Sequence, residues 1–198
     1  VWASNPPSMT FRQPRNLKQI LCRNTLKNLP YRDGGDLGDT PPGCYKHNHG
    51  GRGRRCLLCP RLMEGSNFSS TYTGLTYNIK HNFTCKSKFV IYLITCRQCN
   101  KQYVGKTRQH MHTRHTGHRS EIENLSSELG EHFSRCGVEN IILQIIDCVK
   151  EGEDEALSVL EGYWQNKLAT FKANGGNINL RNDWRNYLGQ QPILFWDP

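Results

Sequence analysis

The sequence has little that would place it in a membrane. No apolar run approaches the roughly 20 residues that a membrane-spanning helix needs, and no signal peptide opens the chain. An initiator methionine is also missing, so we expect a fragment of a longer polypeptide. The 198 residues suffice for one domain, or for one domain and a small satellite. We expect no membrane partner.

Acidic residues are scarce in the first part of the chain. Residues 1–86 contain 13 Lys and Arg but only 4 Asp and Glu, whereas residues 87–198 contain 13 of each kind. The whole formal net charge of +9 therefore belongs to residues 1–86. Such a basic segment favours a polyanion as partner, most simply nucleic acid. The alternative is a solvated tail that only keeps the protein soluble.

Cysteine is abundant, with nine residues. Two pairs have Cys-x-x-Cys spacing, at 56–59 and at 96–99, in a basic context that also contains histidines. This context favours zinc over disulfides. A secreted disulfide protein is the alternative, but the odd number of cysteines and the missing signal argue against it. We interpret Cys22 and Cys148 as small buried residues.

The stretch from Val90 to His118 organises the rest of the chain. An apolar, β-branched run predicts a strand at 90–95, followed by a polar turn at 96–101 and a short strand at 102–104 that Gly105 ends. Apolar and histidine residues then recur at three- and four-residue spacing. They predict a helix that has on one face Met111, His115, His118, Ile122 and Leu125.

Four polar side chains are expected to converge on this hairpin. Arg114 and His118 lie one helical turn apart, so both can point toward the strands that carry Tyr92 and Tyr103. Together, such groups can position a water molecule and bind a phosphate. Taken singly, each has a plainer interpretation: the tyrosines as core aromatics, the arginine as a surface residue, and the histidine as a zinc ligand or a core residue.

The remaining pattern contains both helices and strands. It predicts a helix at 15–26, a hairpin at 68–79, a helix at 127–136 stopped by Gly137, a buried strand at 140–147, and a helix at 153–172 stopped by residues 174–176. The predicted fold class is therefore α+β, a small and mostly antiparallel sheet flanked by helices. Zinc-binding elements and a basic N-terminal extension are added to it.

Glu161 is the unusual residue of the last predicted helix. It shares a face with apolar residues, which are Leu157, Leu160, Trp164, Leu168 and Phe171. Burying a carboxylate is costly unless the group is paired or binds a metal. The alternative is that Glu161 lies at the edge of this face and reaches water.

Two tripeptides resemble the two halves of the GIY-YIG nuclease signature. Residues 90–92 (Val-Ile-Tyr) resemble the first half with Val in place of Gly, and residues 103–105 (Tyr-Val-Gly) resemble the second. The helix that follows is similar to that of the family, in which an Arg and a His lie four residues apart. It is represented here by Thr107, Met111, Arg114 and His118. The similarity covers roughly residues 56–177.

The Cys-x-x-Cys at 96–99 lies between the two halves and is not general in the family. It resembles the endonuclease domain of Penelope-like retroelements. The segment 83–92, which leads into and includes the first half of the motif, also resembles that domain. This resemblance implies a polyprotein in which a reverse transcriptase precedes the segment. DNA is then the expected substrate, RNA or the reverse transcriptase part of the same polyprotein an expected partner, and the nucleus the expected location.

The resemblance divides the chain into four parts. They are a basic extension and linker at 1–43, a zinc-knuckle-like, DNA-contacting segment at 44–86, a GIY-YIG-like nuclease domain at 87–180, and a C-terminal arm at 181–198. Basic residues of the second and third parts are the expected DNA contacts, namely Arg52, Arg54, Arg55, Lys106 and Arg108.

The family similarity also implies roles in metal-dependent DNA cleavage. One of Tyr92 and Tyr103 would activate the attacking water and the other would orient it. Arg114 would bind the scissile phosphate and stabilise its developing charge, and His118 would assist proton transfer. The reaction is then hydrolysis of a DNA phosphodiester.

Two further positions follow from the same resemblance. Glu161 matches the metal ligand of the family and would hold Mg²⁺ or Mn²⁺. Asn177 resembles the asparagine that closes the motif set, with Asn179 as a nearby competitor. Hydrolysis with the 3′ oxygen as leaving group would yield a 3′-hydroxyl end, which can prime reverse transcription.

Two structural zinc sites are expected. Cys96 and Cys99 are followed by His132-x-x-x-Cys136, a spacing that suits three cysteines and one histidine, with His118 as the alternative ligand. Penelope-type domains have a similar pattern, with two cysteines between the motif halves and two histidines downstream. Cys136 would replace one of those histidines here. A second site can be built, with His47 or His49 as substitute ligands, from Cys44, Cys56, Cys59 and Cys85.

Two other functions stay open. A non-catalytic, zinc-dependent nucleic-acid-binding module could derive from such a domain, but it would have no reason to keep the four residues Tyr92, Tyr103, Arg114 and Glu161. A cellular GIY-YIG repair nuclease that cuts branched DNA is the other alternative. The Cys-x-x-Cys inside the motif argues against it.

Overall fold

A computed structural model describes residues 41–47, 56–172 and 177–179. The predicted helix at 15–26, the C-terminal arm at 181–198 and the group Arg52, Arg54 and Arg55 lie outside the described residues. Within the described part of the chain, no helix is both long and apolar enough to cross a bilayer.

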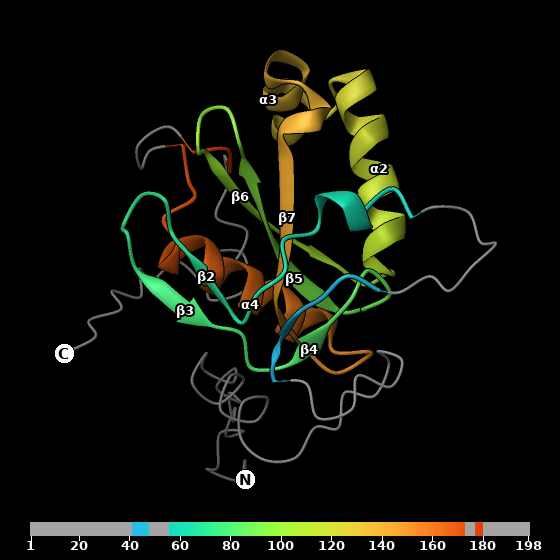
Figure 1. Ribbon diagram of the computed structural model, residues 1–198, viewed down its shortest axis with the longest axis vertical. Helices are drawn as coiled ribbons and strands as arrows, with labels where there is room; N and C mark the ends of the chain where they lie inside the picture. Colours follow the sequence, from blue (N-terminus) through green and yellow to red (C-terminus); the bar gives the residue numbers. More distant parts are fainter. Residues whose placement is uncertain (1–40, 48–55, 173–176, 180–198) are drawn as a thin grey trace, which may run out of the picture.

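A three-stranded antiparallel sheet forms the centre of the molecule (Figure 1). Its strands are β5 (Val90–Cys96), β6 (Gln102–Thr107) and β7 (Ile141–Cys148), in the order β6-β5-β7. The central strand β5 buries every side chain except that of Thr95, because it has a strand on both edges and cover on both faces. This burial explains its continuous apolar run.

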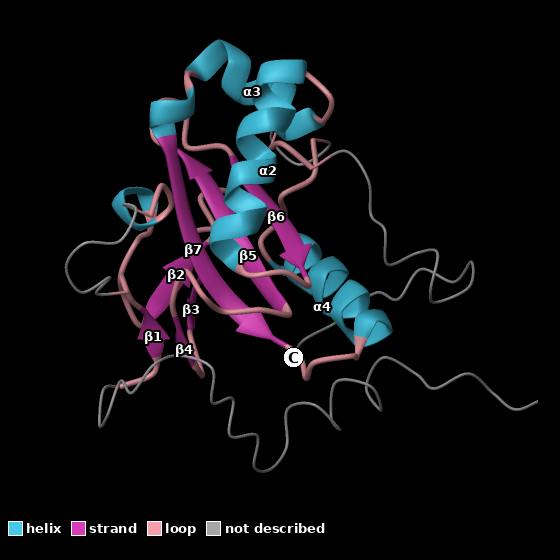
Figure 2. Ribbon diagram, turned by 90° about the vertical axis from the view of Figure 1, so that its right-hand side faces the viewer, coloured by secondary structure: helices cyan, strands magenta, loops and turns pink. Residues whose placement is uncertain are grey.

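Three helices flank this sheet: α2 (Met111–Asn124), α3 (Glu128–Cys136) and α4 (Asp154–Lys167). Figure 2 shows α2 in front of the sheet and α4 beyond β6. The Ser127 side chain caps α3 by accepting a hydrogen bond from the Gly130 N–H, and Gly137, with φ +83°, ends it as predicted. α3 packs mainly on α2.

Residues before the central sheet pack onto it. The hairpin of β2 (Asn67–Ser69) and β3 (Thr76–Asn78) forms as predicted, and β1 (Gly43–Cys44) pairs in parallel with β4 (Asn82–Phe83). Two short 3₁₀ turns, η1 (Cys59–Arg61) and η2 (Val138–Asn140), complete the described elements. Side chains of this part, among them Leu58, Phe68 and Phe83, join the same hydrophobic core as β5.

The predicted order of elements and the α+β class are confirmed, but three boundaries are wrong. β6 continues through Gly105 to Thr107, because its ladder with β5 continues through that glycine. α2 stops before Leu125, which is left-handed with φ +51° and exposed. α4 ends at Lys167, well before the Gly-Gly pair, in a Schellman motif whose left-handed residue is Ala169.

Candidate active site and zinc sites

The two tyrosines of the sequence motif lie on one face of the sheet. Tyr92 pairs with Gly105, and Ile94, two residues further along β5, pairs with Tyr103. Because side chains two residues apart on a strand point the same way, both rings lie on the face that α2 covers. Tyr92 is fully buried there, whereas Tyr103 is partly exposed.

Gly105 makes this packing of the tyrosines feasible. A Cβ atom at Gly105 would lie 2.6 Å from the Tyr92 hydroxyl and 2.7 Å from a ring carbon of Tyr103. Any side chain would therefore displace both rings. The tyrosine side chains themselves fill the space next to Gly105.

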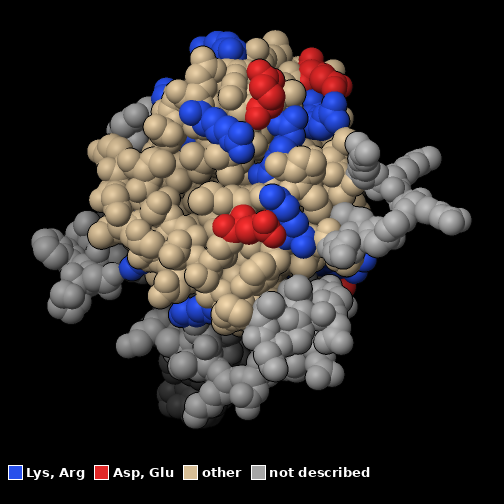
Figure 3. Space-filling view, in the orientation of Figure 1, with Lys and Arg blue, Asp and Glu red and all other residues tan. Residues whose placement is uncertain are grey.

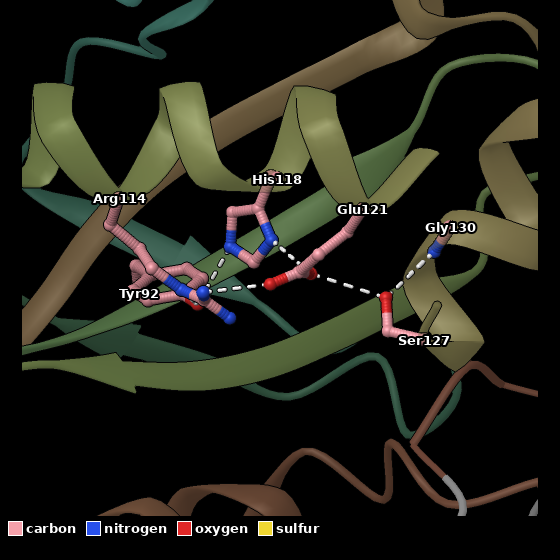
Figure 4. A network of polar contacts seen from close by, with 6 residues as sticks. All are labelled: Tyr92, Arg114, His118, Glu121, Ser127 and Gly130. Carbon is pink, nitrogen blue, oxygen red and sulfur yellow. Dashed lines mark hydrogen bonds and ion pairs between the residues drawn. The ribbon is translucent and has the colours of Figure 1, made fainter. Parts of the chain in front are cut away.

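Arg114 and His118 reach the tyrosines from α2, as their four-residue spacing predicts. The Tyr92 hydroxyl lies 2.8 Å from Nε2 of His118 and accepts a hydrogen bond from Nε of Arg114 at 3.2 Å (Figure 4). The His118 ring meets both tyrosine rings edge to face. Three of the four predicted residues thus share one hydrogen-bonded cluster, and Tyr103 borders it.

Burial sets the protonation states in this cluster. It raises the pKa of Tyr92 to about 12, partly offset by the charge of Arg114, and it raises the pKa of Tyr103 as well. It also lowers the pKa of His118, which the carboxylate of Glu121 partly restores. At neutral pH, both tyrosines keep their protons and the imidazole is neutral.

Glu121 completes the cluster, and the sequence analysis missed it. One carboxylate oxygen accepts from Nη1 of Arg114 at 2.8 Å, and the other accepts from Nδ1 of His118 at 3.0 Å (Figure 4). The hydrogen bond from His118 lowers the pKa of Glu121 to about 2, so this group is ionised at neutral pH. Its position three residues after His118 and seven after Arg114 was the available signal.

Glu161 lies on α4, on the other side of the cluster. Its side chain is only 7% exposed and forms an ion pair with Nζ of Lys106 at 2.9 Å. The same Nζ donates to the Ser158 hydroxyl at 2.8 Å. Glu161 is close enough to both tyrosines for its charge to raise their pKa values. The carboxylate is therefore buried as the helical pattern predicts, and it is paired.

A cleft of about 690 Å³ opens between α2, α4 and the end of β6. One wall of the cleft is basic, and the other is the acidic first turn of α4. The lining comprises Lys106, Thr107, Arg108, Gln109, Arg114, Asp154, Glu155, Leu157 and Ser158. The basic side chains of such a cleft can bind a phosphate, and carboxylates lie on the opposite wall.

All of these groups belong to residues 88–174, which match the family model of the GIY-YIG catalytic domain. The chain contains a GIY-YIG catalytic domain. Members of this family are nucleases, and they use divalent metal ions. The presence of such a domain implies that the substrate is DNA. Searches of curated proteins and of solved structures found no match to the chain.

The surroundings of Glu161 in the GIY-YIG domain fit one divalent cation. Glu161 offers a hard oxygen ligand, and water and phosphate oxygens can supply the rest of a Mg²⁺ or Mn²⁺ shell. The ion pair with Lys106 shows that a positive charge is accommodated against this buried carboxylate.

The expected catalytic role of Asn177 is not supported by its position. Its side-chain oxygen accepts from the Gln102 N–H, and its side-chain nitrogen donates to the Ala169 carbonyl, both at 2.9 Å. Asn179 binds both backbone groups of Val104 in the same way. Both asparagines thus hold the chain after α4 along the edge of β6, and neither points to the tyrosine cluster.

The first expected zinc site assembles in the GIY-YIG domain. Its ligand atoms all lie within 4.8 Å of one another, and they belong to Cys96, Cys99, His132 and Cys136. Burial and the charges of nearby lysines and arginine lower the pKa of His132, which favours the neutral, metal-binding imidazole. The alternative ligand His118 is occupied by Tyr92 and Glu121. The group can hold zinc.

Three of the four cysteines expected at the second site also meet. The sulfurs of Cys56, Cys59 and Cys85 lie within 4.8 Å of one another. Cys44 does not join them: it is fully buried in β1, its sulfur accepts from the Ile145 N–H, and burial raises its pKa to about 12. The prediction of Cys44 as a ligand is therefore wrong.

Of the expected DNA contacts, Lys106 and Arg108 are described and line the cleft. Lys106 pairs with Glu161, and Arg108 forms an exposed ion pair with Asp154 at 3.2 Å. Further basic side chains gather in the upper half of the face in Figure 3, toward α3. Lys101 and Arg135 both act electrostatically on His132, which places positive charge beside the first cysteine group.

Proposed function

We propose that the GIY-YIG domain is a metal-dependent DNA endonuclease that leaves a 3′-hydroxyl end. The observation that carries the proposal is the convergence of Arg114, Tyr92 and His118 within hydrogen-bond distance. This cluster borders a cleft whose other wall is α4, the helix of Glu161. A basic group, a proton acceptor and a carboxylate are the parts that hydrolysis of a phosphodiester requires.

Arg114 is placed to bind the scissile phosphate. Of its five N–H groups, one on Nε donates to Tyr92 and one on Nη1 donates to Glu121. No other hydrogen bond of this guanidinium exists among the described residues, and Arg114 lines the cleft. The three remaining N–H groups can therefore contact phosphate oxygens and stabilise the charge that develops on them.

The two tyrosines take different parts in this proposal. Tyr103 is partly exposed, so its hydroxyl orients the attacking water. The water gives its proton to the Tyr92 oxygen while Tyr92 passes its own proton to Nε2 of His118. The water oxygen bonds to phosphorus, the bond to the 3′ oxygen breaks, and this oxygen takes a proton from solvent. His118 later returns its proton to solvent.

When bound at Glu161, a Mg²⁺ or Mn²⁺ ion would supply a Lewis acid for the phosphate oxygens. Lys106, which contacts Glu161 and Ser158, lines the cleft and would offer its ammonium to the DNA backbone. Zinc at the two cysteine groups would be structural, because the thiol groups lie away from the cleft lining.

Incubation of supercoiled plasmid with the protein and Mg²⁺ or Mn²⁺ tests the enzyme. We expect nicked or linear DNA from the parent protein and none from Glu161→Gln, because the amide is a poor ligand for the cation. Glu151→Gln, an exposed carboxylate outside the cleft, is the matched control and should cleave like the parent.

Two binding measurements accompany this test. Glu161→Gln should keep its affinity for DNA but lose Mn²⁺ binding in a titration without DNA. Cleavage by Glu161→Gln at the parent rate would contradict the metal assignment. If the parent and both variants bind DNA fully but none of them cleaves it, the result would instead favour a nucleic-acid-binding module.

We further propose that the domain comes from a Penelope-like retroelement and acts in the nucleus beside a reverse transcriptase. The support is the Cys-x-x-Cys between the two motif halves, whose cysteines meet His132 and Cys136 in space. The nicked product should then serve directly as a primer when a reverse transcriptase and nucleotides are added. A 3′-phosphate end, which cannot be extended without prior treatment, would contradict the priming role.

A further inference from the structure

Glu121 connects the two catalytic groups of α2 to each other. It lies three residues after His118 and seven after Arg114, so all three side chains share one face of the helix. Its two carboxylate oxygens are divided between them, with Arg114 on one and His118 on the other (Figure 4). A carboxylate that binds two different cations or donors fixes their separation as well as their directions.

The contact with His118 selects one tautomer of its ring. A carboxylate can only accept, so the proton of the neutral imidazole lies on Nδ1, which faces Glu121 at 3.0 Å. Nε2 then carries the lone pair and accepts from the Tyr92 hydroxyl at 2.8 Å. The opposite tautomer would place an N–H against Tyr92 and two lone pairs against each other at Glu121. The proton path of the proposed reaction exists in one tautomer only.

The contact with Arg114 fixes the plane of its guanidinium. Tyr92 holds Nε at 3.2 Å and Glu121 holds Nη1 at 2.8 Å, so the planar group is anchored at two of its three nitrogens. Two anchors define its rotation, whereas the tyrosine alone would leave it free to turn about that single contact. Arg114 lines the cleft, so the remaining N–H groups of the guanidinium are offered there in a fixed plane.

Glu121 is itself held by the start of α3. The Ser127 hydroxyl donates to the same oxygen that binds His118, at 3.1 Å, while it caps α3 by accepting from the Gly130 N–H (Figure 4). Gly130 packs so tightly that a Cβ atom there would lie 2.4 Å from the Glu121 carbonyl oxygen. The helix that carries His132 and Cys136 therefore sets the position of Glu121.

We propose that Glu121 is a positioning residue of the catalytic site, which orients Arg114 and selects the tautomer of His118. The proposal deepens the nuclease function and rests on it. It further implies that α3 maintains the geometry of the cleavage site. The first zinc group (Cys96, Cys99, His132 and Cys136) would contribute through α3. A plain ion pair that only stabilises α2 would have no influence on the tautomer of His118 or on the pH dependence of cleavage.

The test compares Glu121→Gln with Glu123→Gln, an exposed carboxylate on the same helix. In single-turnover nicking with Mg²⁺, we expect Glu121→Gln to be slower by about 10- to 100-fold, the usual effect of losing an orienting group. Its affinity for DNA should change little, because Glu121 makes no contact with the cleft. Glu123→Gln should match the parent in both measurements.

The pH profile of the cleavage rate separates positioning from stability. His118 is faced by Tyr92 from β5, by Tyr103 from β6, and by Arg114 and Glu121 of α2, with His115 also acting on it electrostatically. Of these groups, Glu121 raises the pKa of His118. Its replacement should therefore move the acid side of the profile to lower pH. A slower variant with an unmoved profile would overturn the proposal.

A measurement without DNA keeps this inference distinct from the nuclease function. ¹⁵N chemical shifts of the His118 ring should show a proton on Nδ1 in the parent and a mixture of tautomers in Glu121→Gln. A parent protein that does not cleave, but shows this change, would refute the proposed function and leave the positioning role standing. A proton on Nε2 in the parent would refute the positioning role whatever the cleavage result.

Discussion

His115 is the most unusual buried residue outside the catalytic cluster. It lies on α2 between Arg114 and His118, is fully enclosed, and neither ring nitrogen has a hydrogen-bond partner among the described residues. Burial first, and then the charges of Arg61 and Arg119, lower its pKa to about 4. Its ring is therefore neutral in the folded protein at any pH near neutrality.

This histidine should make the protein less stable in acid. The unfolded chain binds a proton below a pKa of about 6.5, whereas the folded chain resists it until about 4, so stability falls as pH decreases across this interval. The full effect is about 3 kcal/mol, of which about 2 kcal/mol is lost by pH 5. When the pH is lowered from 7.5 to 5, the parent should therefore lose about 2 kcal/mol more unfolding free energy than His115→Leu does.

Urea unfolding of both proteins at the two pH values measures this difference. Release of a bound metal ion in acid would affect both proteins alike and would cancel in the comparison. Equal pH dependence of the parent and His115→Leu would show that His115 has a polar partner or is already protonated in the folded state.

The residues of the proposed catalytic site were predictable to the extent that spacing determined them. Tyr92 and Tyr103 follow from two short strands, and Arg114 and His118 from one helical turn. Glu121 was missed because an acidic residue on a polar helix has no special pattern by itself. Asn177 was assigned by position in a motif, and only the contacts along β6 show that its amide binds backbone groups.

At the scale of elements, the first zinc group joins the turn between β5 and β6 to α3. Cys96 is the last residue of β5, Cys99 lies in the turn that follows, and His132 and Cys136 belong to the helix. α3 has only nine residues, too few for a stable isolated helix. Its position thus depends on packing against α2, and a zinc ion held by the four ligands would add a cross-link.

Cys136→Ser should remove zinc from this group and loosen α3. We expect the metal content to fall from two zinc ions per chain to one, and the thermal unfolding temperature to fall with it. Cleavage should also decrease, because α3 holds Ser127 against Glu121. Cys148→Ser is the matched control, since Cys148 belongs to neither metal group and burial raises its pKa to about 12.

Elemental analysis and thermal unfolding measure these two effects. Two zinc ions in Cys136→Ser, or one in Cys148→Ser, would contradict the assignment of ligands. An unchanged cleavage rate in a zinc-depleted but folded Cys136→Ser protein would break the link between α3 and the catalytic cluster.

Elements were predicted better in kind than in extent. The apolar runs of β5 and β7 and the helical spacing of α2 and α4 sufficed to predict the α+β order. The end of α4 was not predictable, because Ala169 adopts the left-handed conformation that usually marks glycine, while the Gly-Gly pair lies further on. Gly105 reads as a stop in the sequence, but packing of the tyrosines explains it inside β6.

At the scale of the whole molecule, charge and the second cysteine group belong to the same part of the chain. The backbone N–H of His47 donates to the Cys59 sulfur, and Cys56 belongs to the same three-sulfur group. Residues 47 and 56 thus both lie at that group. In the sequence, the three arginines at 52, 54 and 55 fall between them, within the basic segment 1–86 that holds the whole net charge of +9.

Replacing Arg52, Arg54 and Arg55 together by Gln should weaken DNA binding without regard to sequence. Each phosphate contact contributes about 0.9 to the slope of log affinity against log salt, so the loss of three contacts should reduce that slope by about 3. The cleavage rate at saturating DNA should stay at the parent value, since the catalytic cluster lies within residues 88–174.

A second triple variant, with Gln at Arg12, Arg15 and Arg23, removes the same charge from the beginning of the chain. If anchoring beside the metal group directs the three arginines at 52–55 to DNA, this control should lose much less of the salt dependence. Equal losses in both variants would mean that the basic segment acts through its total charge alone. A lower cleavage rate at saturating DNA would instead place these arginines at the scissile phosphate, and the cleft would then have to include them.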